Sequence, residues 1–496
     1  MHTALLLDMA AGAFPDRLAL GSLADGVSYG ELALRARAGA AWLDRLGEGS
    51  IVFIGLNGPA LPTAVFAAGL LARPFAPLNY RLSNEELRKL LARTAPSVAI
   101  VDADMLPRVA DAPGVVLVSR DQFEAACLDE AHRAAELTEI DPDIAVLLFT
   151  SGTTGEPKAA VLRHRHLTSY VISTVEFMGA DEEEAALVSV PPYHIAGISA
   201  VLTGVYGGRR VVHLPAFTPE AWVEAAAAER ITHAMMVPTM LGRVLDLLQA
   251  SGERLPHLRA LSYGGGRMPQ PVIERALALL PHVDFVNAYG LTETSSTIAV
   301  LGPDDHRAAI ASDDPSVRRR LGSVGRPLAS LELEIRGLDG EPVPAGAAGE
   351  VWVRGEQISG EYLGRKLIRD DGWFPTNDSG WLDEAGYLFV EGRLDDVIVR
   401  GGENISPGEI EDVLRAHPAV RDVAVIGLPD LQWGERVAAV VVADAPADQL
   451  ADWVRQRLRS TKTPEAFFFR EALPYNETGK LLRRALRAEL AEPAAA

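Results

Sequence analysis

Residues 147–162 have the sequence Leu147-Leu148-Phe149-Thr150-Ser151-Gly152-Thr153-Thr154-Gly155-Glu156-Pro157-Lys158-Ala159-Ala160-Val161-Leu162. An apolar run leads into a loop of two glycines and four hydroxyl residues, and the chain becomes apolar again after a proline and a lysine. Small residues let backbone N–H groups approach an anion, hydroxyls donate further hydrogen bonds, and a lysine adds positive charge. The loop therefore predicts a phosphate-binding site, and a polar turn between two strands is the alternative.

The loop differs from the Walker loop of nucleoside triphosphatases. The spacing from Gly152 to Lys158 does not fit G-x-x-x-x-G-K-[ST], and Ala159 stands where that motif has a magnesium-binding hydroxyl. A nucleoside triphosphatase of that kind is therefore disfavoured.

Length and charge exclude several classes of protein. A chain of 496 residues is too long for one core and predicts two to four domains, and 48% hydrophobic with 23% charged residues is typical of a globular protein. The formal net charge of -20 argues against a general nucleic-acid-binding protein, because a phosphate backbone would be repelled. The basic runs 163–166 and 318–320 are interpreted as solvated surface.

Neither a disulfide nor a membrane span is predicted. The single cysteine, Cys127, has no partner within the chain, is expected to be a small buried residue, and fits a reducing cytosol. Residues 1–8 lack the basic residues and the length of a signal peptide, and no uncharged run reaches about 18 residues. We therefore expect a cytoplasmic protein without integral membrane association.

Hydrophobic periodicity predicts an α/β fold for most of the chain. Residues 51–56 and 97–101 are typical of buried strands, 64–72 of a helix, and 83–87 of a capped helix start. After the loop a helix is predicted at 221–230, and strands are predicted at 187–190, 210–214, 233–237 and 260–263. Strands that alternate with helices predict parallel sheets covered on both faces.

The pattern changes twice towards the C-terminus. Residues 332–335 and 349–354 alternate polar and apolar between Gly/Pro-rich turns, which predicts an antiparallel sheet or small barrel. After Arg393 a compact α+β unit is predicted. Its elements are a helix opened by a capping box at Ser406 to Glu409 with proline at the first helical position, strands at 423–428 and 437–442, and a helix at 447–459.

Further motifs follow the loop. They are Tyr289-Gly290-Leu291-Thr292-Glu293, the region of Asp378, Gly392-Arg393-Leu394-Asp395-Asp396, Gly401-Gly402-Glu403-Asn404 and Asn476-Glu477-Thr478-Gly479-Lys480. Together with the loop they cover most of the chain and resemble, in the same order, the motifs of the adenylate-forming superfamily. That superfamily contains acyl-CoA synthetases, peptide-synthetase adenylation domains and firefly luciferase, and this chain most resembles an acyl- or aryl-CoA ligase.

The resemblance implies a domain organisation. A large N-terminal domain, residues 1–392, would comprise αβ-layered subdomains and the small barrel-like β subdomain, and would bind ATP and the acid. A hinge at 393–396 would lead to a small mobile α+β domain at 397–490. The tail, residues 491–496, is expected to be disordered.

The resemblance also implies ATP-dependent activation of a carboxylic acid. A carboxylate oxygen attacks the α-phosphorus of ATP and pyrophosphate leaves, so positioning and positive electrostatics supply most of the catalysis. The loop matches, residue by residue, the family's cradle for the β- and γ-phosphates: Thr150, Ser151, Gly152, Thr153, Thr154, Gly155 and Lys158. Mg²⁺ is expected at Glu293, with the hydroxyl of Thr154 nearby.

The nucleoside of ATP is expected at two further motifs. The glycine run Gly264-Gly265-Gly266 permits a backbone to lie against adenine, and a flexible turn is the alternative interpretation of this run. Tyr289 is expected to stack on the base as the family's aromatic residue does. By resemblance Asp378 and Arg393 hold the ribose hydroxyls, with Asn377 where the family usually has glycine. The remaining expected nucleotide contacts are Asn287, Ala288, Gly290 and Thr292.

Lys480 corresponds to the family's catalytic lysine, which bridges the substrate carboxylate and the α-phosphate. A surface lysine flanking a helix is the alternative. Relatives then rotate the small domain about a hinge residue, here Asp395. The rotation withdraws the lysine and brings Gly401 and Gly402 to the site, where their lack of side chains leaves room for a pantetheine arm.

CoA is the expected thiol acceptor. Trp433 matches a tryptophan that some CoA-using aryl ligases place near CoA, and Arg81 stands where some carry an arginine for its phosphate. Those ligases have a basic, aromatic string ahead of the catalytic lysine, whereas here Lys462 is the one basic residue of 461–465. The 3′-phosphate of CoA thus has fewer cationic partners, and the phosphopantetheine of an acyl carrier protein is the alternative acceptor.

The acid is expected beyond residues 191–197. His194 matches a histidine that relatives place beside the substrate carboxylate, with a structural histidine as the alternative. Val237, Gly264 and Gly290 are further expected contacts. The methionines suggest an adaptable apolar wall, for which core packing is the alternative: Met235, Met236 and Met240. Peptide-synthetase domains anchor an ammonium with an aspartate near this histidine, and none stands here, so a fatty or aromatic acid is expected.

Three classes of function follow. The leading one is an AMP-forming acid–thiol ligase. A catalytically silent family member is disfavoured by four intact residues, Lys158, Glu293, Arg393 and Lys480, and no feature of the sequence specifically supports a luciferase-like oxygenase. A homodimer is compatible with the sequence.

Overall fold

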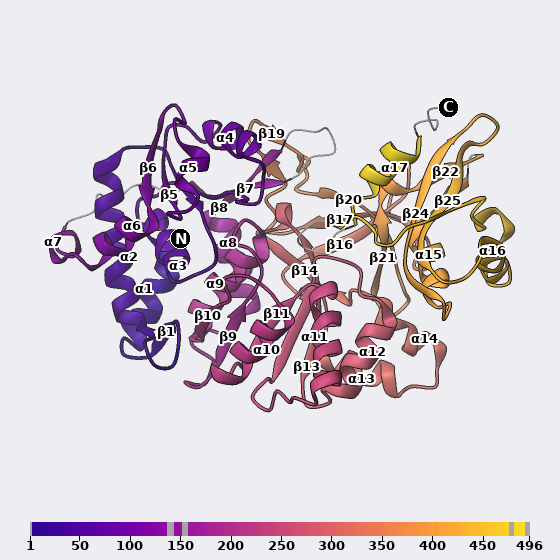
Figure 1. Cartoon of the computed structure of the whole chain (residues 1–496), viewed down its shortest axis with the longest axis horizontal. Coiled ribbons are helices and arrows are strands. Elements are labelled where there is room, and N and C mark those ends of the chain that lie inside the picture. The colour runs from indigo at the N-terminus through magenta and orange to yellow at the C-terminus, as the bar shows by residue number, and fades with distance from the viewer. Residues whose placement is uncertain (1, 136–142, 151–156, 402, 476–480, 492–496) are drawn as a thin grey trace.

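The computed structural model describes residues 2–135, 143–150, 157–401, 403–475 and 481–491. The chain builds two large mixed sheets, a four-stranded antiparallel sheet and a five-stranded sheet. Figure 1 shows the N-terminal helices α1 (Ala4–Ala13), α2 (Tyr29–Leu46) and α3 (Ala60–Leu70) at one end of the molecule and the small C-terminal lobe at the other. The predicted fold class, α/β with a large N-terminal part and a smaller C-terminal part, is confirmed.

The eight-stranded sheet has the order β19-β18-β8-β7-β4-β3-β5-β6. Its strands are β3 (Ser50–Ile54), β4 (Phe75–Pro77), β5 (Ser97–Val101), β6 (Val115–Ser119), β7 (Ile144–Thr150), β8 (Lys158–Arg163), β18 (Glu361–Tyr362) and β19 (Arg365–Lys366). Strands β7 to β6 are parallel, whereas β8, β18 and β19 are antiparallel. The parallel sheet predicted from the first 140 residues is confirmed for β3, β4, β5 and β6, whereas the antiparallel strands β8, β18 and β19 come from later segments of the chain.

The nine-stranded sheet has the order β15-β14-β13-β12-β11-β9-β10-β1-β2. Its strands are β1 (Leu18–Leu20), β2 (Val27–Ser28), β9 (Ala185–Val188), β10 (Arg210–His213), β11 (His233–Met236), β12 (Ala260–Gly264), β13 (Asp284–Leu291), β14 (Ser296–Leu301) and β15 (Arg326–Pro327). The strands from β1 to β13 are parallel, and β2, β14 and β15 are antiparallel. Each strand predicted between 187 and 263 is present, displaced by at most two residues.

Helices cover the faces of both sheets. They are α4 (Asn84–Ala92), α5 (Leu106–Val109), α6 (Arg120–Leu128), α7 (Glu130–Arg133), α8 (His164–Thr174), α9 (Ile195–Gly207), α10 (Pro219–Ala228), α11 (Pro238–Ser251), α12 (Gln270–Leu279), α13 (Pro303–Ala311) and α14 (Pro315–Arg318). The predicted helix start at 83–87 is confirmed, because Ser83 and Glu86 form a reciprocal capping box. Cys127 is buried between α2 and α6, as predicted, and Tyr29 and Trp222 are fully buried in the core.

The antiparallel sheet comprises β16 (Glu332–Arg336), β17 (Gly349–Arg354), β20 (Phe374–Leu382) and β21 (Leu388–Arg393), as the alternating pattern predicted. A short turn, η3 (Leu394–Asp396), leads from β21 into the C-terminal lobe. That lobe contains β22 (Ile398–Arg400), β23 (Glu403–Ile405), β24 (Val420–Asp430), β25 (Gly434–Ala443), β26 (Ala466–Phe469), α15 (Pro407–Arg415), α16 (Ala447–Arg455) and α17 (Arg483–Ala491).

Three details of the C-terminal lobe differ from expectation. Ser406 precedes α15 but makes no capping bond, because its hydroxyl donates to the carbonyl of Glu391 at 3.4 Å; the predicted capping box is wrong, although Pro407 does occupy the first turn. Helix α16 ends at Arg455, short of 459. Ala491, assigned to the tail, belongs to α17, and the rest of the tail lies outside the described residues.

None of the helices in the described part of the chain combines the length and the apolar character needed to cross a bilayer.

Candidate active site

Most of the described residues predicted to bind ATP lie at the carboxyl ends of parallel strands. Gly264 ends β12, Tyr289 and Gly290 lie near the end of β13, and His194 follows β9. Ligands of open α/β sheets bind at this edge. The antiparallel sheet adds residues from β20 and β21, so the nine-stranded sheet and the antiparallel sheet both contribute to the site.

Asp378 and Arg393 face each other across β20 and β21. The Arg393 Nε lies 3.1 Å from Asp378 Oδ1, and another guanidinium nitrogen donates to the carbonyl of Thr376 at 2.8 Å. Burial would lower the pKa of Arg393, but the neighbouring carboxylates of Asp378 and Glu293 raise it, so the guanidinium stays charged. The predicted ribose-binding residues Asp378 and Arg393 therefore lie close enough to Glu293, the predicted metal ligand, for their charges to interact.

Tyr289 also contacts Asp378. Its hydroxyl donates to Asp378 Oδ2 at 2.5 Å, a contact that the sequence did not indicate. The carboxylate of Asp378 therefore contacts both Tyr289 of β13 and Arg393 of β21.

Glu293 lies in the 3-10 turn η1 (Thr292–Thr294), directly after β13. Its carboxylate accepts a hydrogen bond from the hydroxyl of Tyr362, and its carbonyl accepts the N–H groups of Ser359 and Gly360, both at 2.9 Å. No sequence motif indicated Tyr362. It belongs to the two-residue strand β18, which lies between β19 and β8; β8 is about 200 residues away in the sequence, and no local pattern marks such a pairing.

Thr150 and Lys158 stand at the facing ends of β7 and β8. They are register partners, and the Thr150 hydroxyl lies 3.5 Å from the carbonyl of Lys158. The Lys158 ammonium is 5.9 Å from the ring centroid of Tyr362. The other predicted cradle residues lie outside the described residues: Ser151, Gly152, Thr153, Thr154 and Gly155.

The residues present fit a magnesium ion. Mg²⁺ is usually held by one or two carboxylates together with substrate phosphates. Glu293 offers a carboxylate in the same neighbourhood as Lys158 and Thr150, which are predicted to contact phosphates.

Two of the predicted glycines are required by strand packing. A Cβ at Gly264 would collide with the carbonyl oxygen of Ala288 on β13, and one at Gly290 with that of Ser296 on β14. Gly265 has a φ of +75°, which favours glycine. Asn287 is buried, and its amide donates to the carbonyl of Ser323 at 3.0 Å, so this nitrogen is engaged within the protein.

Several residues predicted to contact the acid belong to the hydrophobic core. Met236, Val237 and Met240 are buried in the hydrophobic cluster around Tyr263, whereas Met235 is half-buried on the other face of β11. Of the three methionines proposed as an apolar wall, Met236 and Met240 are thus core residues.

His194 precedes α9 and is linked to Arg81 by ring contacts. Its imidazole lies 4.7 Å from the ring of Tyr193, which lies 5.6 Å from that of Tyr80. The guanidinium of Arg81 is 5.5 Å from the Tyr80 ring centroid, and Arg81 is exposed. The residues predicted for the acid and for the CoA phosphate therefore lie along one aromatic row.

Gly401 and Trp433, both predicted for the pantetheine arm, are in contact. The Gly401 N–H donates to the Trp433 carbonyl at 2.7 Å, and a Cβ on Gly401 would lie 2.8 Å from the indole. Arg400 lies over the indole at 4.8 Å, and Lys462 pairs with Glu409. Gly402 lies outside the described residues.

Asp395 is held from both sides of the predicted hinge. Its Oδ2 accepts from the Asn377 amide at 3.0 Å, and its carbonyl accepts from Arg487 of α17 at 3.0 Å. Asn377 has a φ of +61°, the left-handed region that glycine and asparagine tolerate best. This conformation explains why asparagine replaces the family's glycine.

Lys480 lies outside the described residues, but both ends of its segment are fixed. Tyr475 and Leu481 form an antiparallel bridge, and the Leu482 N–H donates to the Pro474 carbonyl at 2.9 Å. The Tyr475 hydroxyl lies 2.9 and 3.0 Å from the two oxygens of Asp422.

Arg483 ties this segment to α15. It donates to the buried carboxylate of Glu411 at 2.6 Å and lies 3.8 Å from Asp396. Arg483→Ala should lower the free energy of unfolding by about 3 kcal/mol, because it removes the nearest cation from a buried carboxylate. Denaturant unfolding measures the loss, and the exposed pair Arg421–Asp444 supplies the control: Arg421→Ala should cost under about 1 kcal/mol. Equal losses in the two variants would contradict this prediction.

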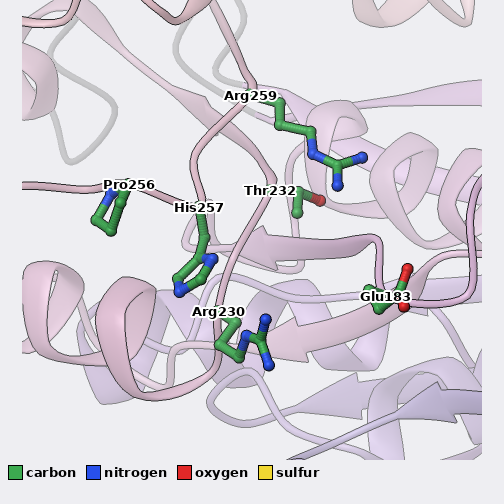
Figure 2. A pocket seen from close by; sticks show the side chains of 6 residues that line it. All are labelled: Glu183, Arg230, Thr232, Pro256, His257 and Arg259. Atoms are coloured by element: carbon green, nitrogen blue, oxygen red, sulfur yellow. The ribbon is translucent and has the colours of Figure 1, made fainter.

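A pocket of about 130 Å³ lies elsewhere (Figure 2). It is lined by Glu183, Arg230, Thr232, Pro256, His257 and Arg259. Thr232 and Arg259 directly precede β11 and β12, so the pocket lies at the amino ends of strands whose carboxyl ends face the candidate site.

Family models match most of the chain. The AMP-binding enzyme model matches residues 7–363, and the model of the AMP-binding enzyme C-terminal domain matches residues 409–480. The chain therefore belongs to the AMP-binding enzyme family. The resemblance to adenylate-forming enzymes predicted from the sequence motifs is confirmed.

Named relatives and a solved structure agree with this assignment. The chain is 35% identical over 477 residues to a feruloyl-CoA synthase of an Amycolatopsis species, covering 93% of each chain, and 31% identical over 505 residues to an indoleacetate–CoA ligase of Aromatoleum aromaticum, covering 97% and 96%. The o-succinylbenzoate CoA synthetase of Bacillus subtilis, solved with its acyl-adenylate intermediate, superposes with a TM-score of 0.82 at 29% identity over 98% of each chain. The predicted enzyme class, an AMP-forming acid–thiol ligase, is confirmed.

Proposed function

We propose that this enzyme uses ATP and Mg²⁺ to convert an aromatic carboxylic acid into its acyl adenylate, and then transfers the acyl group to CoA. One observation carries the proposal: in a member of the AMP-binding enzyme family, Lys158, Glu293, Asp378 and Arg393 lie close together around Tyr289 and Tyr362.

Each group has a distinct task in the first half-reaction. Lys158 and the hydroxyl of Thr150 would hold the departing pyrophosphate, and Asp378 with Arg393 would fix the ribose. Glu293 would hold Mg²⁺, which supplies positive charge to the phosphate oxygens. Lys480 would be the cation that joins the carboxylate to the α-phosphate.

The acid is proposed to be aromatic. The sequence is compatible with a fatty or an aromatic acid, and the feruloyl, indoleacetate and succinylbenzoate enzymes named above all act on acids that carry an aromatic ring. The fatty-acid alternative, and with it a role in fatty acid metabolism, stays a prediction that the acid panel below tests. A cytoplasmic location and a homodimer also stay predictions.

CoA is preferred over an acyl carrier protein as the acceptor. The contact between Gly401 and Trp433 and the exposed Arg81 offer candidates for the pantetheine arm and the phosphate. A carrier protein presents the same thiol, so transfer to a carrier is the alternative that the experiment must separate.

Pyrophosphate release measured over a panel of acids tests the proposal. Ferulic, indoleacetic and 2-succinylbenzoic acids should each be compared with fatty and amino acids, with CoA, with a phosphopantetheinylated carrier protein, and with neither. We expect at least about tenfold faster release with one or more aromatic acids, equivalent to about 1.4 kcal/mol of transition-state discrimination, and a thioester with CoA. Release with fatty acids alone, or acylation of the carrier alone, would overturn the corresponding part of the proposal.

A further inference from the structure

Tyr362 joins three elements of the candidate site. Its strand, β18, pairs with β8 at Ala160, and the N–H of Leu363 donates to the carbonyl of Ala159 at 2.8 Å. Its hydroxyl donates to Glu293 Oε1 and is also hydrogen-bonded to the side chain of Thr150. The ring lies 5.9 Å from the Lys158 ammonium. One side chain thus contacts the predicted metal ligand and Thr150, and lies beside Lys158, so it is close to both described ends of the phosphate loop.

The backbone around Tyr362 also holds Glu293. The N–H groups of Ser359 and Gly360 both donate to the Glu293 carbonyl at 2.9 Å. The neighbouring carboxylate, Glu361, is fixed by Arg163 of β8 at 2.8 to 3.1 Å. Residues 359–362 therefore fix the positions of both the main-chain carbonyl and one carboxylate oxygen of Glu293.

We propose that Tyr362 is a positioning residue for Glu293, holding Oε1 so that Oε2 is presented to the magnesium ion of the bound nucleotide. The inference rests on the proposed function, because it needs Glu293 to be the metal ligand. A carboxylate that ligates a metal is commonly oriented by a hydrogen bond to its other oxygen, and loss of such a partner typically costs 10- to 100-fold in metal affinity. Within the described residues, the hydrogen bond from Tyr362 is the one found on this carboxylate.

The position of Tyr362 beside the phosphate loop also suits this role. Because the Tyr362 side chain also contacts Thr150 and lies beside Lys158, it fixes the position of Glu293 relative to the residues predicted to contact the phosphates. A metal ion held by both the protein and the nucleotide would need these groups at fixed positions.

Tyr362→Phe removes the hydroxyl and keeps the ring, so it tests the inference directly. ATP binding should be measured by calorimetry with Mg²⁺ and with EDTA. We expect the affinity for ATP with Mg²⁺ to fall about tenfold and the affinity in EDTA to stay within about twofold of wild type. The Mg²⁺ concentration for half-maximal pyrophosphate release should rise by about the same tenfold factor.

Tyr387→Phe is the matched control. Its hydroxyl also donates to a carboxylate, Asp305 Oδ1, at 2.5 Å, but this pair joins the β20–β21 turn to α13, outside the proposed site. This variant should bind ATP like wild type under both conditions.

A double-mutant cycle with Glu293→Gln separates positioning from a structural role. If Tyr362 acts through Glu293, adding Tyr362→Phe to Glu293→Gln should cause no further loss of Mg²⁺-dependent affinity. An equal loss with and without Mg²⁺, additive losses in the cycle, or an unchanged Tyr362→Phe would each overturn the inference. A wild-type protein that binds no ATP would instead overturn the proposed function, so the two failures are distinguishable.

Discussion

Lys480→Ala is expected to reduce adenylation about 100- to 1,000-fold while ATP still binds with near wild-type affinity. The lysine would stabilise charge that develops between the acid carboxylate and the α-phosphate in the transition state, and loss of one such donor typically costs that much. ATP itself would be held by other groups, among them Lys158 and Arg393, which this substitution leaves in place. Pyrophosphate release reports the first effect, and calorimetry with ATP reports the second.

The control for this prediction is another cation of the same lobe. Arg421 is exposed and pairs with Asp444 at 3.5 Å, so Arg421→Ala should leave adenylation within about twofold of wild type. Thioester formation from added acyl adenylate should also survive in Lys480→Ala, because the rotation implied by the resemblance would withdraw this lysine before the second step. Near-normal adenylation by Lys480→Ala would contradict its assignment.

The features that sequence predicted best are encoded locally. The Ser83 capping box needs two side chains three residues apart, and strands such as 97–101 are apolar runs of the length that a buried strand requires. The proximity of Asp378 and Arg393 was implied by family motifs, and the structure shows them as register partners on neighbouring strands.

Features that depend on distant partners were missed or misjudged. Tyr362 enters the site because a two-residue strand pairs with β8, which no local pattern reveals. Ser406 has the residue type of an N-cap, yet its hydroxyl donates to Glu391 on another element. Met236 and Met235 are adjacent in sequence, and the alternation of a strand sends one to the core and leaves the other half-buried. In each case tertiary contacts decided between alternatives that the sequence left open.

Asp395→Pro should retain adenylation within a few-fold and slow thioester formation about 100-fold, the loss that a misplacement of about 1 Å in a reacting group can cause. Proline fixes φ near −65° and so removes a torsion that rotation of the small lobe would use. The two half-reactions should be measured separately, as pyrophosphate release and as thioester formed from added acyl adenylate and CoA.

Asp395→Ala is the matched control for the proline variant. It loses the same side-chain contact with the Asn377 amide but keeps the torsion free, so both half-reactions should remain near wild type. A blocked rotation should slow thioester formation alone, whereas general damage to the turn η3 would slow both half-reactions alike. Equal slowing of both half-reactions in the proline variant would therefore contradict the assignment of Asp395 as the hinge.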